Sequence, residues 1–324
     1  MTTSPSRATP QRLTLPEPLT TPETSILITG GAGFIGSHLA DALTASPTHP
    51  EVRILDDLSS GCLENTPADA TFIEGDVRDP ATFESAMADV DVVFHESALV
   101  SVDASVENPE KSHSINVDGT LQVLEAARAQ DARVVLASSA AIYGHPESIP
   151  VSESHPKRPS SPYGLDKLTV DHYARLYHEL YGLETVALRY FNVYGPRQSA
   201  GHYSGVISTF LEQARAEQPI TVHGDGSQTR DFVHVSDVVR ANVLAAETDH
   251  VGEAFNVGTG EETSVEELAV TIQELSETTA DVVYTQPRPG DIERSRADVS
   301  EAESKLGFRS TVSLEDGLRT LLGE

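Results

Sequence analysis

Short apolar runs alternate with amphipathic helical patterns through the first two thirds of the chain. Six runs rich in Val, Ile and Leu lie at 25–30, 52–58, 70–76, 91–98, 133–140 and 184–195. Helical spacing of apolar residues follows at 34–43, 116–129 and 163–181. Apolar β-branched runs that alternate with helices are typical of right-handed βαβ units. The pattern therefore predicts an α/β fold with a doubly wound parallel sheet.

Beyond residue 195 the pattern becomes less regular. Helical spacing is expected at 204–216 and 264–277, with a short strand at 220–226 between them. A further helix at 231–247 and a strand at 253–258 are expected to return to the main sheet. We therefore expect a main domain at 25–190 plus about 229–258. A smaller α+β domain, formed by 191–228 and 259–324, would close over the sheet and bind substrate.

The first two dozen residues are rich in Thr and Pro and lack the apolar stretch that a signal peptide contains. They are expected to form a disordered tail (1–24) rather than a signal peptide. No stretch approaches the roughly 20 apolar residues that a membrane span needs. The sequence therefore favours a cytoplasmic protein.

The formal net charge is −28, and the acidic residues are spread along the whole chain. Lysine is nearly absent, with Lys111, Lys157, Lys167 and Lys305 the only four. Such a surface repels nucleic acid and anionic membranes, so neither is expected as a partner. Concentrated salt would screen the self-repulsion. We therefore interpret the composition as salt adaptation, with an acidic protein of ordinary surroundings as the alternative.

Cysteine and histidine offer little metal chemistry. Cys62 is the only cysteine, which excludes a disulfide within the chain. The twelve histidines are scattered and form no motif with metal-ligand spacing. No metal site is therefore predicted.

A glycine-rich turn follows the first expected strand. TGGAGFIGSHLADAL (29–43) carries Gly30, Gly33 and Gly36 and then opens a helix. Glycine permits the tight turn and lets the backbone approach a pyrophosphate, which the N-terminus of the helix then binds. The motif alone is weak, but here it stands in the required strand–turn–helix context. It predicts a dinucleotide-binding Rossmann domain.

Two carboxylates stand at the ends of the next two strands. Asp56 lies twenty residues after Gly36 and can accept hydrogen bonds from the ribose hydroxyls of NAD. No arginine follows to bind a 2′-phosphate, which favours NAD over NADP. Asp76 ends the third run and is expected to contact adenine, although in isolation it would be a turn residue.

The stretch SPYGLDK (161–167) places a tyrosine and a lysine four residues apart. Ser161 suits a helix N-cap and Pro162 the first helical position, so Tyr163 and Lys167 share one helix face. A nearby ammonium favours a phenolate, so Lys167 is expected to lower the pKa of Tyr163. A tyrosine tuned in this way can act as a general base near neutral pH.

The strand at 133–140 ends in LASSAAIYG, at the edge where doubly wound folds bind ligands. A serine there can relay a proton between a substrate hydroxyl and Tyr163. Ser138 and Ser139, taken alone, would more often cap the strand end. Together with the glycine turn and the Tyr163–Lys167 pair, they indicate an oxidoreductive site.

Seven motifs in order resemble the extended short-chain dehydrogenase/reductases that act on nucleotide sugars, most closely the UDP-glucose 4-epimerase group. They are TGGAGFIG, SSAAIYG, YGLDK, LRYFNVYGPR, GDGSQTRDFVHVSD, FNVGTG and RPGD. The resemblance covers nearly all of the chain from residue 25 onward. It implies NAD as cofactor, a UDP-sugar substrate and a homodimer formed through the helices that begin near Asn116 and Tyr163.

By position, the resemblance implies the following roles. The catalytic residues would be Ser139, Tyr163 and Lys167, with Asn116 supporting the site through the helix it begins. Cofactor contacts would come from Gly30, Gly33, Phe34, Ile35, Gly36, Asp56, Asp76, Val77, Tyr163 and Lys167. Substrate contacts would come from Ser139, Asn192, Val206, Thr221, His223, Arg230, Arg288, Asp291 and Ser295. Arg230 and Arg288 would bind the diphosphate, and Asp291 would hold a ribose hydroxyl or orient Arg288. Thr221 and His223 would pack the uracil ring, although His223 could equally be an ordinary strand-edge histidine.

The residues after Ser139 bear on the reaction. Family members that eliminate water or CO₂ carry an acidic residue there, whereas this chain has Ala140 and Ala141. The resemblance therefore implies C4 epimerisation of a UDP-hexose through a transient 4-keto sugar. Ser295 stands where a bulky residue would restrict the C2 substituent, so N-acetyl sugars are expected to fit as well.

Other interpretations stay open. A 4,6-dehydratase, a decarboxylase or a dTDP-sugar epimerase would share the same motifs. A non-catalytic NAD-binding regulator would usually lack the tyrosine or the lysine, and a simple sugar dehydrogenase would accumulate free NADH.

Overall fold

A computed structural model describes residues 19, 21–45, 48–198, 205–288 and 290–323. Most of the predicted tail, residues 1–18 and 20, lies outside this range. The end of that segment differs from the expectation. Leu19 is 1% exposed and packs in the core with Ile26 and Val243, and the carbonyl of Thr24 accepts a hydrogen bond from the backbone N–H of Glu51.

The centre of the molecule is a seven-stranded sheet in which every neighbouring pair is parallel. In spatial order the strands are β11 (Glu253–Val257), β6 (Thr185–Tyr190), β5 (Arg133–Ser139), β4 (Val92–His95), β1 (Ser25–Thr29), β2 (Glu51–Asp56) and β3 (Thr71–Glu74). The order reverses between β1 and β4, which is the topological switch point where such sheets bind ligands. The predicted doubly wound sheet is confirmed.

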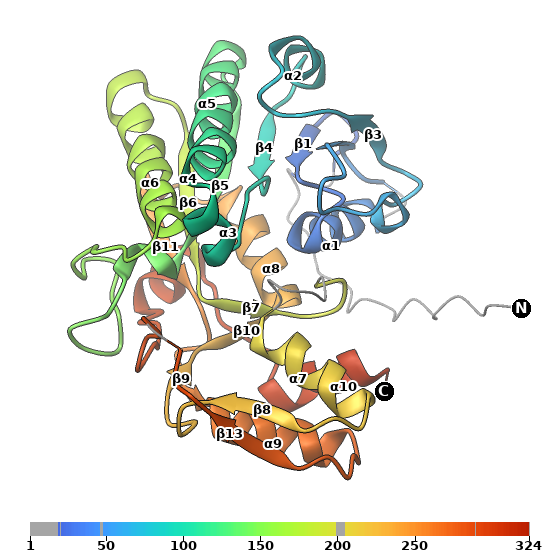
Figure 1. The fold of residues 1–324 in the computed structure, drawn as a ribbon. Coiled ribbons are helices and arrows are strands. Elements are labelled where there is room, and N and C mark those ends of the chain that lie inside the picture. The colour runs from blue at the N-terminus through green and yellow to red at the C-terminus, as the bar shows by residue number, and fades with distance from the viewer. Residues whose placement is uncertain (1–18, 20, 46–47, 199–204, 289, 324) are drawn as a thin grey trace, which may run out of the picture.

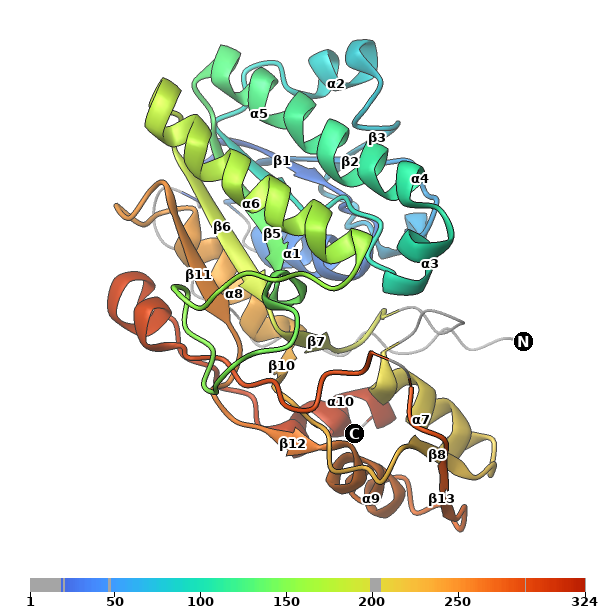
Figure 2. The same cartoon turned by 60° about the vertical axis from the view of Figure 1, so that its left-hand side comes forward.

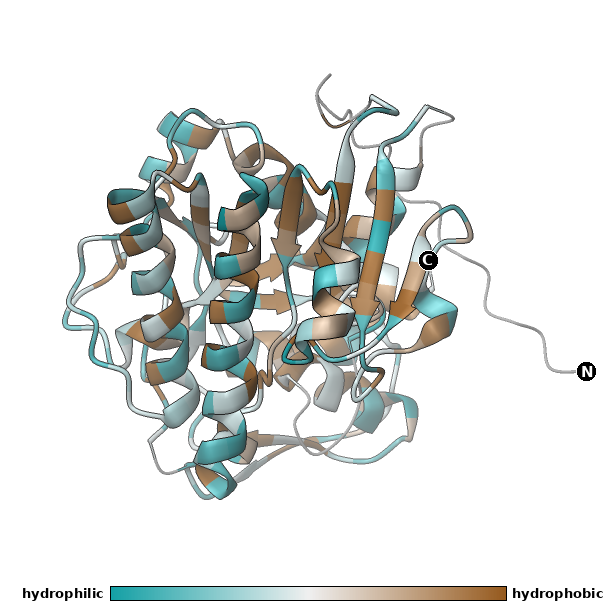
Figure 3. Ribbon diagram, turned by 90° about the horizontal axis from the view of Figure 1, so that it is seen from above, coloured by the Kyte–Doolittle hydropathy of each residue, from teal (hydrophilic) through white to brown (hydrophobic). Residues whose placement is uncertain are grey.

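Helices cover both faces of the sheet, as Figure 2 shows. Helices α1 (Phe34–Thr44) and α8 (Val235–Ala245) pack on one face, with Ile26 and Ile28 of β1 in the same core. Helices α2 (Pro80–Ala86), α5 (Gly119–Gln130) and α6 (Pro162–Tyr181) pack on the other face, which Leu27 joins. This alternation follows from the strand period of two. Figure 3 shows the consequence, with hydrophobic strands inside and hydrophilic residues on the outer faces of the helices.

The segment between β4 and α5 is helical but irregular. Helices α3 (Val102–Glu107) and α4 (Pro109–His113) lead into a π-helical turn at Ser114–Asp118, from which α5 continues. Short 3₁₀ turns lie at Leu63–Asn65 and Ala140–Tyr143. The predicted helix at 116–129 therefore exists, but its first turn has π geometry, which is common at functional sites.

A smaller unit lies beside the carboxyl ends of the strands (Figure 1). It contains helices α7 (Val206–Arg215), α9 (Val265–Leu275) and α10 (Leu314–Leu322). A second π turn, at Ala302–Leu306, packs instead in the core of the main domain. Its short strands are β7 (Asn192–Tyr194), β8 (Ile220–His223), β9 (Thr229–Arg230), β10 (Phe232–His234), β12 (Thr263–Ser264) and β13 (Val282–Thr285). The unit has its own core, which includes Phe210, Ile220 and Leu268.

Two predicted elements differ from the structure in detail. The sixth apolar run divides at Phe191 into β6, which joins the main sheet, and β7, which pairs with β10. The helix expected at 231–247 begins only at Val235, because Phe232–His234 forms β10. The predicted return of 253–258 to the main sheet is confirmed, since β11 pairs with β6. In the described ranges no helix is long and apolar enough to cross a membrane.

Candidate active site

The glycine turn connects β1 to α1 at the switch point of the sheet. Gly30 has φ of 70°, a left-handed conformation that favours glycine, and its N–H donates to the carbonyl of Leu55 at 2.8 Å. A Cβ atom at Gly36 would lie 2.4 Å from the carbonyl oxygen of Gly30. Helix α1 begins against this turn and has no acidic residue in its first turn and no side-chain cap. The backbone thus forms a cradle suited to a pyrophosphate.

Asp56 joins the end of β2 to this cradle. Its Oδ2 accepts from the N–H of Ala32 at 3.0 Å, and its Oδ1 accepts from the N–H of Leu58 at 2.8 Å. The side chain is 7% exposed, and burial raises the pKa of Asp56. The sequence placed this carboxylate correctly at the strand end, where a ribose would lie.

Asp76 follows β3 in the chain, and its carboxylate forms an ion pair with Arg78. Its Oδ1 accepts from Nε of Arg78 at 2.9 Å, and the hydrogen bonds from Arg78 lower the pKa of Asp76. Arg78 also donates to Oγ of Ser114, which ties this corner to the π turn. The neighbouring Val77 is 6% exposed. At the other end of the cradle, Phe34 opens α1 and Ile35 packs against the core.

Ser139 and Tyr163 meet at the carboxyl end of β5. Ser139 is the last residue of β5, and Tyr163 lies in the first turn of α6, where Ser161 caps the helix by accepting from the N–H of Gly164 at 3.1 Å. Ser139 lies close enough to Tyr163 to lower the pKa of its hydroxyl. Lys167, one turn further along α6, donates from Nζ to the carbonyl of Ala137 at 2.7 Å. The three predicted catalytic residues are therefore adjacent.

The charges at this site differ from the expectation in one respect. Burial raises the pKa of Tyr163, and the hydrogen bond with Ser139 lowers it only in part. The expected lowering by Lys167 is wrong, because Lys167 is itself desolvated beneath the site and its ammonium is directed at Ala137. Burial lowers the pKa of Lys167 to about 8, while Glu96 and Asp166 raise it. The serine, rather than the lysine, is the group that stabilises the phenolate directly.

A buried polar network supports the active-site edge from below. Asn116, in the π turn, accepts from the N–H of Leu99 at 2.8 Å and donates to its carbonyl at 3.1 Å. His95 bonds Thr29 at 2.7 Å and Thr120 at 2.9 Å. Burial lowers the pKa of His95 to about 3, so this imidazole stays neutral. The helical turn predicted to support the site therefore holds the loop that follows β4.

A cavity of about 170 Å³ opens beside Ser139. Its lining includes four of the predicted residues, namely Ser139, Asn192, Arg230 and Ser295. Arg230 forms an ion pair with Asp291 and donates to the carbonyl of Ile292 at 2.6 Å. The cavity thus combines the strand-end serine with a guanidinium held in place from two sides.

Several predicted substrate residues lie outside this cavity. Val206 opens α7 and packs against the core of the smaller unit, and Thr221 and His223 lie on β8. Arg288 is exposed beyond β13. One interpretation expected Asp291 to orient Arg288. In the structure Asp291 forms its ion pair with Arg230 instead, because the chain turns back after β13. Pro289, between these residues, is outside the described range.

Sequence reasoning missed Glu96, which directly follows β4. Its Oε1 accepts a hydrogen bond from the hydroxyl of Tyr190 at 2.8 Å, and Tyr190 also lines the cavity. No motif marked this residue. The only available signal was a carboxylate at the end of an apolar strand run.

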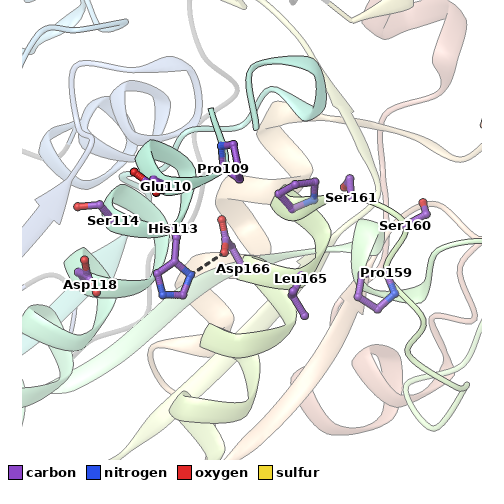
Figure 4. A pocket seen from close by; sticks show the side chains of 11 residues that line it. Pro109, Glu110, His113, Ser114, Asp118, Pro159, Ser160, Ser161, Leu165 and Asp166 are labelled. Carbon is purple, nitrogen blue, oxygen red and sulfur yellow. Dashed lines mark hydrogen bonds and ion pairs between the residues drawn. The ribbon is translucent and has the colours of Figure 1, made fainter. Parts of the chain in front are cut away.

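A second, larger cavity of about 710 Å³ lies near the start of α6, beside α4 (Figure 4). In it Asp166 is directed at His113, with 3.1 Å between its Oδ1 and the ring Nδ1. Asp166 also accepts from Oγ of Ser112 at 2.6 Å. Throughout the part of the chain that the structure describes, no cluster of three His, Cys, Asp or Glu side chains could hold a metal ion.

The site and the fold agree with sequence comparisons. The profile of the NAD dependent epimerase/dehydratase family matches residues 26–258, and the chain belongs to this family. A protein of Methanocaldococcus jannaschii is 43% identical over 300 residues, 92% of this chain and 97% of the relative. The UDP-glucose 4-epimerase of Mycolicibacterium smegmatis is 40% identical, and the match covers 90% of this chain and 95% of the relative. UDP-glucuronic acid decarboxylase 1 of Arabidopsis thaliana is 34% identical, and the match covers 92% of this chain and 69% of the relative.

Solved structures are similar over the same range. A UDP-glucose 4-epimerase of Thermotoga maritima with UDP-glucose has a TM-score of 0.88 and 38% identity, covering 92% of this chain and 97% of the other. A UDP-N-acetylglucosamine 4-epimerase of Methanobrevibacter ruminantium with UDP-N-acetylmuramic acid has a TM-score of 0.87 and 37% identity, covering 92% and 98%. A Thermus thermophilus UDP-glucose 4-epimerase with NAD has a TM-score of 0.84 and 38% identity, covering 92% and 97%. This protein is thus an enzyme of the epimerase type whose cofactor is NAD.

Proposed function

We propose that the enzyme catalyses C4 epimerisation of a UDP-hexose through a transient 4-keto sugar. The observation that carries the proposal is the position of Ser139, which lies beside Tyr163 and lines a cavity together with Arg230. The similarity to UDP-sugar epimerases supports it.

The glycine cradle and Asp56 fit the cofactor. A side chain at Gly36 would collide with the backbone of Gly30, so the turn leaves its N–H groups accessible to a pyrophosphate. Asp56 would accept from the adenosine ribose, while Asp76 and Val77 would border the adenine. When bound, NAD supplies the hydride chemistry at C4. Phe34 and Ile35 would fix the start of α1 beneath the pyrophosphate.

The protein's own groups manage the proton. Tyr163 would remove the proton of the C4 hydroxyl and later return it to the other face, with Ser139 hydrogen bonding the same oxygen. Lys167 lies one helical turn away and would hold the end of β5 in place through its hydrogen bond to the carbonyl of Ala137. Burial of this pair restricts proton exchange with solvent.

Arg230 would bind the diphosphate. Asp291 and the carbonyl of Ile292 hold its guanidinium at the cavity wall, and Asn192 lies on the same wall. We propose that Arg288, Val206, Thr221 and His223 bind the uridine and second phosphate outside the cavity. Firm binding of UDP with few contacts to the hexose would let the 4-keto sugar rotate, so that hydride could return to its other face.

The test is conversion of UDP-galactose by the purified enzyme in molar salt, with chromatographic separation and mass detection. The proposal expects UDP-glucose at unchanged mass. A product lighter by one water or by CO₂ would contradict it and identify a dehydratase or decarboxylase. No conversion would direct the search to dTDP-sugars.

The main alternative is elimination chemistry, because a UDP-glucuronic acid decarboxylase is among the relatives. The strand end argues against it. Ser139 is followed by Ala140 and Ala141, which form the start of a 3₁₀ turn and carry no carboxylate into the cavity. The cavity therefore offers no acidic group next to Ser139 for elimination.

We propose that Ser295 makes room for a C2 N-acetyl group. Its side chain is 8% exposed and lines the cavity. UDP-N-acetylglucosamine should then react within about tenfold of the rate for UDP-galactose. Ser295→Tyr should lower kcat/KM for the N-acetyl sugar by at least about tenfold more than for UDP-galactose, because the larger ring fills the pocket. Ser300→Tyr, an exposed change on the same segment, is the control. Turnover of the N-acetyl sugar below about 1% in the wild type would contradict this proposal.

We also propose that the enzyme is a homodimer joined through the outer faces of α5 and α6. Helix α6 exposes Leu165, Leu180 and Tyr181 by 56%, 59% and 52%. Such an apolar surface is typical of an interface. Sedimentation in molar salt should give twice the chain mass; a single chain mass would contradict the proposal.

The charge of −28 and the nucleotide-sugar chemistry support a salt-rich cytoplasm as the working environment.

A further inference from the structure

We propose that Glu96 is a positioning residue that sets the charges of Tyr163 and Lys167, an inference that rests on the proposed function. The carboxylate would keep Lys167 positive and keep the proton on Tyr163 until a substrate hydroxyl takes its place beside Ser139. None of the motifs that define the site includes this residue.

The fold places Glu96 at the edge of the sheet where Ser139 also lies. Its N–H donates to the carbonyl of Thr29 at 3.1 Å, which fixes its backbone beside the glycine turn. From the end of β4 its side chain reaches Tyr190 at the end of β6, with 2.8 Å between Oε1 and the hydroxyl. Strand β5 lies between these two strands, and its last residue, Ser139, is the register partner of Tyr190. The carboxyl therefore lies at the same edge of the sheet as Ser139, and Lys167 donates to Ala137 on the strand between β4 and β6.

The carboxyl is held by a chain of hydrogen bonds. The Tyr190 hydroxyl donates to Glu96 and accepts from Nδ2 of Asn242 at 2.8 Å. Asn242 is fully buried on α8 and also donates to the carbonyl of Val238 at 3.0 Å. A donor oriented in this way favours the ionised carboxylate. A strand of the sheet and a helix packed on it thus fix the position of the negative charge.

The titratable groups around Glu96 form one coupled set. Glu96 interacts electrostatically with Tyr163 and Lys167 of α6 and accepts a hydrogen bond from Tyr190 of β6, and the neutral His95 precedes it on β4. Burial raises the pKa of Glu96 to about 7, whereas the Tyr190 hydrogen bond and the charge of Lys167 lower it. The Glu96 charge in turn raises the pKa of both Tyr163 and Lys167.

This arrangement suits a reaction that takes a proton off and returns it. A strongly stabilised phenolate would be a weak base, because base strength falls with pKa. A lysine without a counter-charge would lose its proton in so buried a position. Glu96 opposes both effects, so it would keep Tyr163 basic enough to deprotonate the hydroxyl while Lys167 stays charged.

The decisive test is a titration of Tyr163 that does not depend on turnover. Phenolate absorbance of the NAD-loaded enzyme is followed against pH, and the Tyr163→Phe difference isolates this residue from the other tyrosines. Glu96→Gln removes the charge and keeps the shape. The Tyr163 midpoint should fall by about one pH unit, and both limbs of the pH–rate profile should move to lower pH. An unchanged midpoint in the folded variant overturns the proposal.

Glu125→Gln is the matched control. Glu125 also accepts a hydrogen bond from a tyrosine hydroxyl, that of Tyr177 at 2.6 Å, but it lies on α5 away from the cavity. Its substitution should leave the Tyr163 midpoint in place. A shift as large as that of Glu96→Gln would overturn the assignment to Glu96. If UDP-galactose is not converted, the proposed function fails while this titration still decides the role of Glu96.

A second variant keeps the proposal testable if Glu96→Gln does not fold. Tyr190→Phe removes the donor that favours the ionised form of Glu96. The infrared band of the protonated carboxyl that titrates near neutral pH should then persist to higher pH. A band that does not move would overturn the proposal.

Discussion

Tyr163→Phe should reduce epimerisation of UDP-galactose by about three orders of magnitude, the effect of removing a general acid–base group. The phenyl ring keeps the volume and the packing against α6 but has no hydroxyl to exchange a proton with C4. Because Ser139 and Lys167 keep their positions, NAD binding should persist. The measurement is single-substrate turnover in molar salt, with NAD content determined on the same sample.

Tyr177→Phe is the matched control for this prediction. It removes a tyrosine hydroxyl from the same helix, where it bonds Glu125 at 2.6 Å, and should change turnover little. If Tyr163→Phe kept more than about a tenth of the wild-type rate, Tyr163 would not be the base.

Asp171→Ala should destabilise the protein by about 3–5 kcal/mol, because it leaves a buried cation without its partner. Asp171 and Arg189 are 0% and 1% exposed, and Asp171 accepts from Nε and Nη2 of Arg189 at 2.8 and 3.0 Å. It also accepts from Oγ of Ser138 at 3.1 Å, directly before Ser139 in the chain. Urea unfolding at constant high salt measures the loss in the free energy of unfolding.

The pH dependence of this loss follows from the carboxyl. Burial alone would raise the pKa of Asp171, but the hydrogen bonds and charge of Arg189 outweigh it and lower the pKa. The stabilisation is therefore complete above the unfolded pKa of about 3.9 and disappears as the pH falls through the lower folded value. Between about pH 5 and 8 the deficit of the variant should stay constant.

Glu315→Ala provides the surface counterpart. It breaks the exposed Arg319–Glu315 ion pair, 2.7 Å long, and should cost less than about 1 kcal/mol. Equal losses from the two variants would contradict a structural role for the buried pair.

The sheet and the positions of Ser139, Tyr163 and Lys167 were predictable because their signals are local. Strand and helix periods give the order of elements, and the carboxyl ends of parallel strands meet at one edge. Ser139, Tyr163 and Asp56 therefore come to the switch edge in any doubly wound arrangement of these strands. The glycine turn could be predicted for the same reason, since its geometry depends on neighbours within a few residues.

The remaining features depend on contacts between distant segments. Glu96 meets Tyr190 only because β4, β5 and β6 are neighbours in space. Asp291 pairs with Arg230 because of a chain reversal that no motif specifies. The pKa of Tyr163 rises because burial outweighs the lowering effect of Ser139, whereas helix spacing alone suggested that Lys167 would lower it. The roles given to Val206 and His223 stay predictions.

The position of β11 affects how the chain folds during synthesis. Strand β6 has β5 on one side, and its other edge is covered only by β11, which lies 63 residues further along the chain. Until the ribosome has released that segment, an apolar strand edge next to the active site stays unpaired and open to association with other chains. A pause in translation between β6 and β11 would therefore favour aggregation, whereas a pause after β11 would not.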